Sequence, residues 1–252
     1  MPPLLVSPRP APFPDDPFPL LEQGTIEAIE LIPWGSNYTF AAQLRADDGS
    51  DCLAVYKPRR GEIPLRDFPS GTLYKREVAA YRLAHQLGWD LVPPTVIRKD
   101  GPHGIGSLQL YVEPRVDKSA QFDRLRRSHD AELQRMAAFD VLTNNADRKA
   151  GHCLLDVRGH LWGIDHGLTF HHVPKLRTVI WDFAREPLPH DLVATLREVR
   201  ASSARVAAVR NALDGLLSGN ELDALFERWD RLLKRPCFPD LDPYRNVPWP
   251  PF

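Results

Sequence analysis

Polar and ionisable side chains crowd the segment 144–152, directly after a stretch with a helical apolar pattern. The segment holds two amides, one acid, two bases and a histidine: Asn144, Asn145, Asp147, Arg148, Lys149 and His152. Each of these side chains needs a hydrogen-bond partner or water, so this density is unfavourable in a packed interior. A solvated turn, with an asparagine capping the preceding helix, is one interpretation. A loop that carries chemistry is the other.

A second acid, Asp165, stands thirteen residues after His152, between an apolar stretch and a glycine. Two short apolar stretches, 153–156 and 161–164, flank an Arg-Gly pair and predict a hairpin. This hairpin would return Asp165 to the mouth of the loop that holds Asp147. Two acids with a histidine or asparagine donor could then hold Mg²⁺ that bridges the phosphates of a nucleotide.

A lysine and a glutamate in the first half of the chain form a third candidate group. Lys57 ends an apolar strand pattern, and Glu77 follows twenty residues later within a helical pattern. A lysine that neutralises phosphate charge needs a carboxylate to hold it in place. Taken singly, each residue is also typical of a surface charge.

The elements that must position these residues change character along the chain. The first 115 residues alternate as short strands, and the remainder is mainly helical. The predicted strands are 26–32, 38–44, 52–56, 95–98 and 107–112. The predicted helices are 70–87, with Ser70 as its cap and Gly88 at its end, then 130–142, 189–199, 203–217 and 221–233.

These elements predict an α+β fold with two lobes. We expect a proline-rich arm at 1–22 and a β-rich N-lobe at 23–114, made of a five-stranded antiparallel sheet and one helix. The C-lobe, 115–252, is expected to be helical, to carry the polar loop and the hairpin, and to end in an irregular proline-rich arm. Asp140 lies on the apolar face of helix 130–142, and we predict that it anchors the loop.

Composition excludes several classes of partner. The 252 residues carry a formal net charge of -1, so no global field favours nucleic acid or a membrane. No apolar run approaches the roughly 18–20 residues that a spanning helix needs. Three dispersed cysteines, without CxxC spacing, indicate reduced thiols. We therefore expect a cytoplasmic protein without a signal peptide, a nucleic-acid partner or a stable membrane association.

The order of the candidate groups resembles a known family pattern. A glycine-containing turn (35–37), a strand lysine, a helix glutamate, the loop Asp147-Arg148-Lys149-x-x-His152 and Asp165-His166-Gly167 follow one another. This order resembles the protein-kinase-like superfamily, nearest to its phosphatidylinositol 3-/4-kinase-like branch and to HipA-type and Fam20-type atypical kinases. The chain is similar, over about residues 30–170, to an actinobacterial family related to phosphatidylinositol kinases.

The resemblance implies a two-lobed kinase fold and an ATP site with Mg²⁺ or Mn²⁺. Lys57 would contact the α- and β-phosphates, with Glu77 as its ion-pair partner. Backbone amides of Gly35, Ser36 and Asn37 would cover the phosphates. The hinge that binds adenine would comprise 109–113, which contains Gln109, Tyr111 and Glu113.

The resemblance also assigns the chemistry. Asp147 would orient or deprotonate the acceptor hydroxyl, and Asp165 would bind the metal. Arg148 and Lys149 would neutralise charge on the transferring phosphoryl group or on an acidic substrate. The acceptor would be a protein or small molecule rather than a lipid, because the short basic run 124–127 is more typical of a solvated helix end.

Three residues depart from the family pattern. His152 replaces a metal-binding asparagine and favours a softer cation such as Mn²⁺. Lys149 replaces a histidine, and His166 replaces the middle phenylalanine of Asp-Phe-Gly. An inactive nucleotide-binding pseudokinase and an AMP transferase therefore remain alternatives.

A metal-dependent phosphoesterase is a further alternative. Its ligands would come from Asp147, His152, Asp165, His166, His171 and His172. This reading leaves Lys57 and Glu77 without a role, and it lacks paired HxH or HxxxH histidines.

Overall fold

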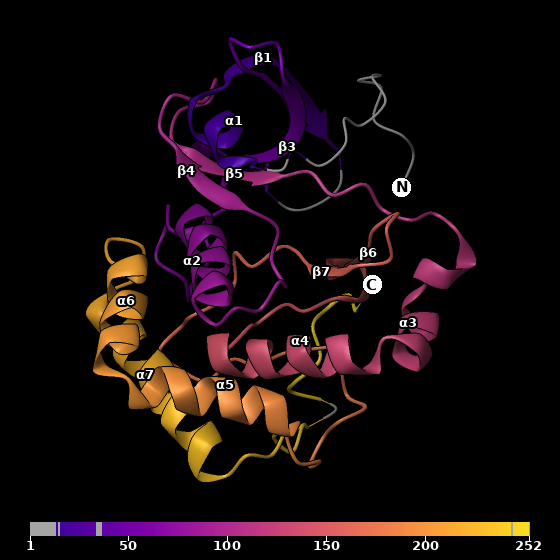
Figure 1. Ribbon diagram of the computed structural model, residues 1–252, viewed down its shortest axis with the longest axis vertical. Coiled ribbons are helices and arrows are strands. Elements are labelled where there is room, and N and C mark those ends of the chain that lie inside the picture. Colours follow the sequence, from indigo (N-terminus) through magenta and orange to yellow (C-terminus); the bar gives the residue numbers. More distant parts are fainter. Residues whose placement is uncertain (1–13, 15, 34–36, 243, 252) are drawn as a thin grey trace. The chain divides into compact units, whose positions relative to one another are not determined.

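The computed structural model describes residue 14 and residues 16–33, 37–242 and 244–251. The fold is mixed α/β, with one antiparallel sheet, one hairpin and several helices (Figure 1). The chain divides into two compact units. We call residues 1–78 with 93–113 the N-unit and residues 79–92 with 114–252 the C-unit.

The N-unit is built on a five-stranded sheet of order β1-β2-β3-β5-β4, in which every neighbouring pair is antiparallel. Its strands are β1 (Thr25–Ile32), β2 (Thr39–Arg45), β3 (Asp51–Pro58), β4 (Thr95–Arg98) and β5 (Gly106–Leu110). All five strands were predicted from the sequence. The fifth ends at Leu110, two residues before its predicted end, so the chain leaves the sheet earlier than expected.

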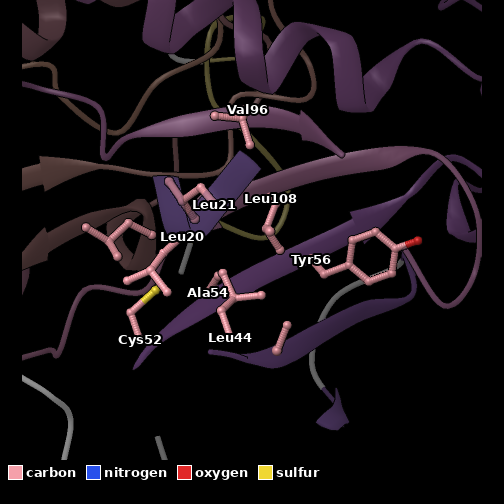
Figure 2. Packing of buried hydrophobic residues seen from close by; sticks show 10 residues of the cluster. Leu20, Leu21, Leu44, Cys52, Ala54, Tyr56, Val96 and Leu108 are labelled. Atoms are coloured by element: carbon pink, nitrogen blue, oxygen red, sulfur yellow. The ribbon is translucent and has the colours of Figure 1, made fainter. Parts of the chain in front are cut away.

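A short helix, α1 (Phe18–Gln23), corrects the prediction of an arm at 1–22. Leu20 and Leu21 are 3% and 0% exposed, and Figure 2 shows them among apolar side chains of the sheet. The buried Arg98 of β4 donates to the carbonyls of Leu21 and Gly24 at 3.1 and 2.8 Å. The high proline content of this region led to the prediction of an arm, so the two core leucines were not predicted.

Strand β3 alternates between two environments along its length. Its core face carries Cys52, Ala54 and Tyr56, which are buried (Figure 2). Lys57 therefore points to the other face of the sheet. Gly106 lies opposite Pro58, where a Cβ would come within 2.4 Å of the Lys57 carbonyl oxygen. Only glycine lets β5 approach the end of β3 so closely.

Helix α2 (Leu73–Gln86) carries Glu77 and crosses the division between the units after Val78. It begins three residues after the predicted cap, Ser70. Glu62 supplies a capping contact instead, because its Oε1 accepts from the amide of Tyr74 at 2.9 Å. A cap from a residue this distant in sequence is invisible to a local pattern.

The C-unit is mainly helical (Figure 1). Its helices are α3 (Phe122–Ser128), α4 (Asp130–Thr143), α5 (His190–Ala201), α6 (Ser203–Leu213) and α7 (Gly219–Lys234). Helix α4 packs on α7, and α5 packs on α6 and α7. None of the helices in the described part of the chain is long and apolar enough to cross a membrane.

The predicted hairpin is confirmed as β6 (Cys153–Leu155) and β7 (Leu161–Gly163). Asp156 fixes its turn, because the carboxylate accepts from the amides of Arg158 and His160 at 2.9 and 2.8 Å. The same carboxylate accepts from the indole of Trp162 at 3.1 Å. These hydrogen bonds therefore fix the path of the chain that leads to Asp165.

Replacing Leu21 with alanine tests whether α1 belongs to the folded N-unit. We expect the variant to lose about 2–5 kcal/mol of unfolding free energy, because a buried leucine leaves a cavity. The neighbouring Glu22 is exposed, so Glu22→Ala should stay within about 0.5 kcal/mol of wild type. Urea unfolding measures both, and equal stabilities of the two variants would mean that α1 is not part of the core.

Candidate functional site

The predicted pairing of Lys57 with Glu77 is confirmed within the N-unit. The Lys57 ammonium donates to Oε1 of Glu77, whose side chain is 3% exposed. A carboxylate buried to this extent needs a cation beside it. The pair therefore fixes the position of the Lys57 ammonium on the face of β3 opposite its core face.

The predicted phosphate-covering turn is described only in part. Gly35 and Ser36 lie outside the described residues. Oδ1 of Asn37 accepts from the amide of Ile63 at 2.8 Å, which joins the start of β2 to the loop after β3.

The hinge prediction needs correction at two positions. Gln109 lies inside the sheet, and its side chain donates to Oγ1 of Thr95 at 2.8 Å. The amide of Tyr111 donates to the carbonyl of Leu53 at 2.9 Å, so it is already used by the sheet. Glu113 lies beyond the sheet and is exposed. The side chain of Gln109 and the amide of Tyr111 therefore already have partners within the sheet.

In the C-unit, the polar loop starts where α4 ends, and Asn144 takes a left-handed conformation there with φ of 54°. Its side chain donates to the carbonyls of His171 and Val173 at 2.8 and 2.7 Å. Its Oδ1 accepts from the amide of Lys175 at 2.8 Å. Asn144 thus ends the helix, as the solvated-turn interpretation supposed, but it is buried and holds a second segment against the loop.

Asp140 anchors the loop, as predicted. It is fully buried, and its Oδ1 accepts from the side-chain amide of Asn145 at 2.9 Å. Oδ1 of Asn145 in turn accepts from the amide of Asp147 at 3.0 Å. The carboxylate on α4 is therefore connected through one amide side chain to the backbone of Asp147.

Arg148 has a different place from the one expected. Its side chain is 0% exposed and forms a bidentate ion pair with Asp140, with Nε–Oδ2 and Nη2–Oδ1 distances of 2.9 Å. Nη1 donates to the carbonyls of His152 and Ile164 at 3.2 and 3.0 Å. Nη2 also lies 2.8 Å from Nε2 of His166. These contacts use all five N–H donors of a guanidinium, so Arg148 holds the loop and the hairpin together and has no N–H left to bind a phosphoryl group.

His152 lies between the loop and Asp165. Its Nδ1 is 2.9 Å from the carbonyl oxygen of Asp147, and its Nε2 is 3.3 Å from Oδ2 of Asp165. A carbonyl oxygen only accepts, so Nδ1 carries the proton in this contact. The amide of Lys149, at 3.4 Å from the same nitrogen, would need Nδ1 as an acceptor, and the shorter contact to Asp147 decides between the two roles. Nε2 then presents a lone pair to a carboxylate oxygen, and such a pair of acceptors calls for a proton or a cation between them.

The same two atoms fit a divalent cation. Neighbouring ligands of an octahedral ion with bonds of about 2.1 Å lie about 3 Å apart. Metal-binding histidines usually donate their other ring N–H to a carbonyl or carboxylate, as Nδ1 does to Asp147. Among the described residues, no group of three or more His, Cys, Asp or Glu side chains could hold a metal ion. Phosphate oxygens and water would have to complete the coordination.

Asp147 is the acid of the loop, and its side chain is 24% exposed. Burial raises the pKa of this carboxyl from 3.8 to about 6, although the Lys149 ammonium at 3.3 Å opposes the shift. The nearby Asp165 raises the pKa further. Lys149, expected to neutralise phosphoryl charge, here pairs with Asp147. The site therefore holds a carboxyl that changes charge near neutral pH.

The remaining histidines do not support a two-metal phosphoesterase. His166 is fully buried, and its Nε2 accepts from Arg148, since a guanidinium offers only donors. Nδ1 of His171 accepts from the amide of Val173 at 3.0 Å. The rings of His171 and His172 are stacked at 4.5 Å between centroids. His166 and His171 thus each commit a ring nitrogen to the protein.

The segment 176–179 was assigned no role from the sequence, although it pairs with the loop. The amide of Arg148 donates to the carbonyl of Arg177 at 3.1 Å, and the amide of Val179 donates back to Arg148 at 3.0 Å. The amide of Arg177 donates to Asn145 at 2.9 Å. These contacts are made by the backbone, so no pattern of side chains in the sequence predicts them.

The buried ion pair predicts a large stability effect at Arg148. Replacement by methionine would leave Asp140 charged and unpaired, and we expect a loss of about 3–5 kcal/mol in unfolding free energy. Arg177 is exposed, so Arg177→Met serves as the matched control. The double change Asp140→Leu with Arg148→Met should cost less than the sum of the two single changes. Denaturant unfolding measures all four proteins, and additive losses would contradict the pairing.

The raised pKa of Asp147 predicts a pH-dependent stability cost. The folded pKa of about 6 exceeds the ordinary 3.8, so the folded protein binds a proton that the unfolded chain has released. This contribution to stability is complete below about pH 4 and is lost as the pH rises through about 6. Asp147→Asn should therefore raise the unfolding free energy by about 1–3 kcal/mol at pH 7 and by much less at pH 4. Unfolding curves at both pH values, with Asp214→Asn as an exposed control, measure this. A variant less stable than wild type at pH 7 would contradict it.

Comparison with solved structures identifies the fold. Hydra Fam20 with sugar matches with a TM-score of 0.54 and 15% identity, over 85% of this chain and 85% of that chain. The Helicobacter pylori proinflammatory kinase CtkA matches with a TM-score of 0.51 and 12% identity, over 86% of this chain and 94% of that chain. The predicted kinase-like α+β fold class is thereby confirmed.

Comparison with sequences identifies relatives. No model of a known protein family matches the chain. Phosphatidylinositol 4-kinase gamma 4 of Oryza sativa subsp. japonica is 33% identical over 63% of this chain, but the match spans only 34% of the rice protein. Protein Rv2133c of Mycobacterium tuberculosis is 38% identical over 94% of this chain and 96% of its own length. The chain therefore belongs to the same family as protein Rv2133c of Mycobacterium tuberculosis.

Proposed function

We propose that the chain is an ATP-dependent phosphotransferase that moves a phosphoryl group to a hydroxyl of a protein or small-molecule acceptor. The observation that carries the proposal is the facing pair of Nε2 of His152 and Oδ2 of Asp165, 3.3 Å apart, beside the loop acid Asp147. The kinase-like fold, shared with hydra Fam20 and CtkA, supports the same reading at a coarser level.

The proposed metal ligands are His152 and Asp165. A bound divalent cation would neutralise charge on the phosphates of ATP. Imidazole suits a softer cation than Mg²⁺, so Mn²⁺ is the expected preference. Arg148 holds the backbone of this pair in place, because it donates to the carbonyl of His152 and to that of Ile164, the residue before Asp165.

Asp147 is the proposed group that receives or directs the proton of the acceptor hydroxyl. A general base works best when its pKa lies near the working pH, and the pKa of Asp147 is raised to about 6. The ammonium of Lys149 lies 3.3 Å from the carboxylate and opposes protonation. Lys149 is thus proposed to keep Asp147 charged in the resting enzyme.

Lys57 is the proposed phosphate contact of the N-unit, held by Glu77. The Lys57 side chain is 22% exposed while that of Glu77 is buried, so the lysine can meet a ligand without leaving its partner. A lysine without this carboxylate would have to be ordered by the nucleotide itself, at a cost in binding free energy.

The proposal predicts metal-dependent binding of ATP. Wild type with ATP and Mn²⁺ at about 100 times the dissociation constant should gain about 2.7 kcal/mol, a rise in melting temperature of about 5–10 °C. Asp165→Asn and Lys57→Met should each reduce this rise strongly. His152→Asn should move the preference from Mn²⁺ towards Mg²⁺. Thermal unfolding with each metal, with and without ATP, measures these effects.

Transfer is then followed with ATP labelled at the γ- or the α-phosphate in cell lysate. Label from the γ-position, lost by about 10²- to 10⁴-fold in Asp147→Asn, supports a phosphotransferase. Label from the α-position would replace the proposal with AMP transfer, and binding without any transfer would replace it with a pseudokinase. Asp223→Asn, an exposed carboxyl on α7, is the control for all steps. No metal-dependent stabilisation of wild type would overturn the proposal.

A further inference from the structure

The segment 246–251, which we call the strap, is fixed to the C-unit through Asn246. The carbonyl oxygen of Asn246 accepts from the amide of Thr178 at 2.8 Å. Its Nδ2 donates to the carbonyl of Leu176 at 2.6 Å. Its Oδ1 and its amide bond the backbone of Asp242, both at 2.8 Å. One partly buried asparagine therefore uses its backbone and its side chain to hold the segment 176–178.

The segment 176–179, held by Asn246, is in turn hydrogen-bonded to the loop. Arg177 bonds through its amide to Asn145 and through its carbonyl to Arg148, at 2.9 and 3.1 Å. Arg148 and Thr178 form a parallel bridge. Asp147 lies between Asn145 and Arg148, so its backbone is held on both sides by residues that this segment contacts.

The strap also reaches the loop directly at its far end. The amide of Ala150 donates to the carbonyl of Pro251 at 3.0 Å. Ala150 starts the short helical turn Ala150–His152, whose last residue faces Asp165. The strap thus contacts the loop three residues after Asp147 and, through 176–178, on the other side of it.

The strap does not serve the apolar core with its large side chains. Trp249 is 89% exposed, and Tyr244, just before the strap, is 95% exposed. Pro248 is buried, but the connections of the strap to the loop are backbone and amide hydrogen bonds. A segment retained for hydrophobic burial would show the reverse distribution. Its hydrogen bonds outside 242–251 go to the loop and to the segment that braces the loop.

We propose that the strap is a positioning element for Asp147, with Asn246 as its positioning residue. Asn246 acts through Leu176 and Thr178 on the backbone that carries the carboxylate, and it is not a catalytic residue. The proposal rests on the proposed function in one respect, namely that Asp147 is the group that acts on the acceptor. Small displacements of such a group lower turnover much more than they lower nucleotide binding.

The isosteric change Asn246→Asp tests this inference. Aspartate can still accept from the amide of Asp242, but it cannot donate to the carbonyl of Leu176, so one contact of the strap is removed. Asn246→Ala removes both side-chain contacts. Asn211→Asp, at an exposed position of α6, is the matched control. Amide hydrogen exchange of the full chain should become at least about fivefold faster in residues 145–152 of both Asn246 variants.

Kinetics provide the second measurement. Its readout is ADP formation by transfer of the γ-phosphoryl group to water, which takes the place of the acceptor hydroxyl. Turnover should fall about 10- to 100-fold in the Asn246 variants, while the dissociation constant of ATP with Mn²⁺ stays within about twofold of wild type. Turnover equal to wild type, or unchanged exchange in 145–152, would overturn the inference. Equal losses of binding and turnover would also overturn it, because they indicate general damage. Failure of wild type to bind ATP would instead overturn the proposed function, and the exchange result separates the two cases.

Discussion

The buried ion pair of Arg148 and Asp140 is the interaction on which the rest of the loop depends. Both side chains are almost fully excluded from solvent, which is costly unless every donor and acceptor is satisfied. Arg148 meets this condition with acceptors from α4, the loop and the hairpin. The same five hydrogen bonds that make the buried charge tolerable also fix the carbonyls of His152 and Ile164. The hydrogen bonds that stabilise the buried charge of Arg148 are therefore the same ones that position the candidate metal ligands.

Stability and chemistry oppose each other around this pair. Asp147 is kept in a site where burial raises its pKa to about 6, which lowers stability at neutral pH. Asn144 and Asp165 both have positive φ, at 54° and 58°, a conformation that non-glycine residues rarely adopt. Such backbone conformations persist only where surrounding contacts determine them. The contacts of Asn144, Asp140 and Arg148 supply that determination on either side of Asp147.

Local patterns predicted the parts of the structure that local forces decide. Strand alternation placed the five strands, and the hairpin before Asp165 followed from two apolar stretches around a turn. Asp140 was recognised because an acid on an apolar helix face needs a partner. Leu20 and Leu21 were missed because nearby prolines dominated the reading. The role of Arg148 was wrong and the bracing by 176–179 unseen, since both depend on residues brought together only by the tertiary fold.

Two of the departures from the kinase pattern, both histidines, lie close together around Arg148 in the structure. In the kinase pattern that the sequence resembles, a phenylalanine would stand at the position of His166, whose Nε2 here accepts from the guanidinium of Arg148. A phenylalanine there could not accept, so one buried N–H of Arg148 would lose its partner. An asparagine would stand at the position of His152 in that pattern. Arg148 binds the carbonyl of His152, and the carbonyl of Asp147 accepts from its Nδ1. The ring of His166 therefore completes the hydrogen bonds of Arg148. The ring of His152 contacts the carbonyl of Asp147, while Arg148 binds only its main chain. Changing His166 towards the family residue alters a partner of Arg148, and changing His152 alters a partner of Asp147.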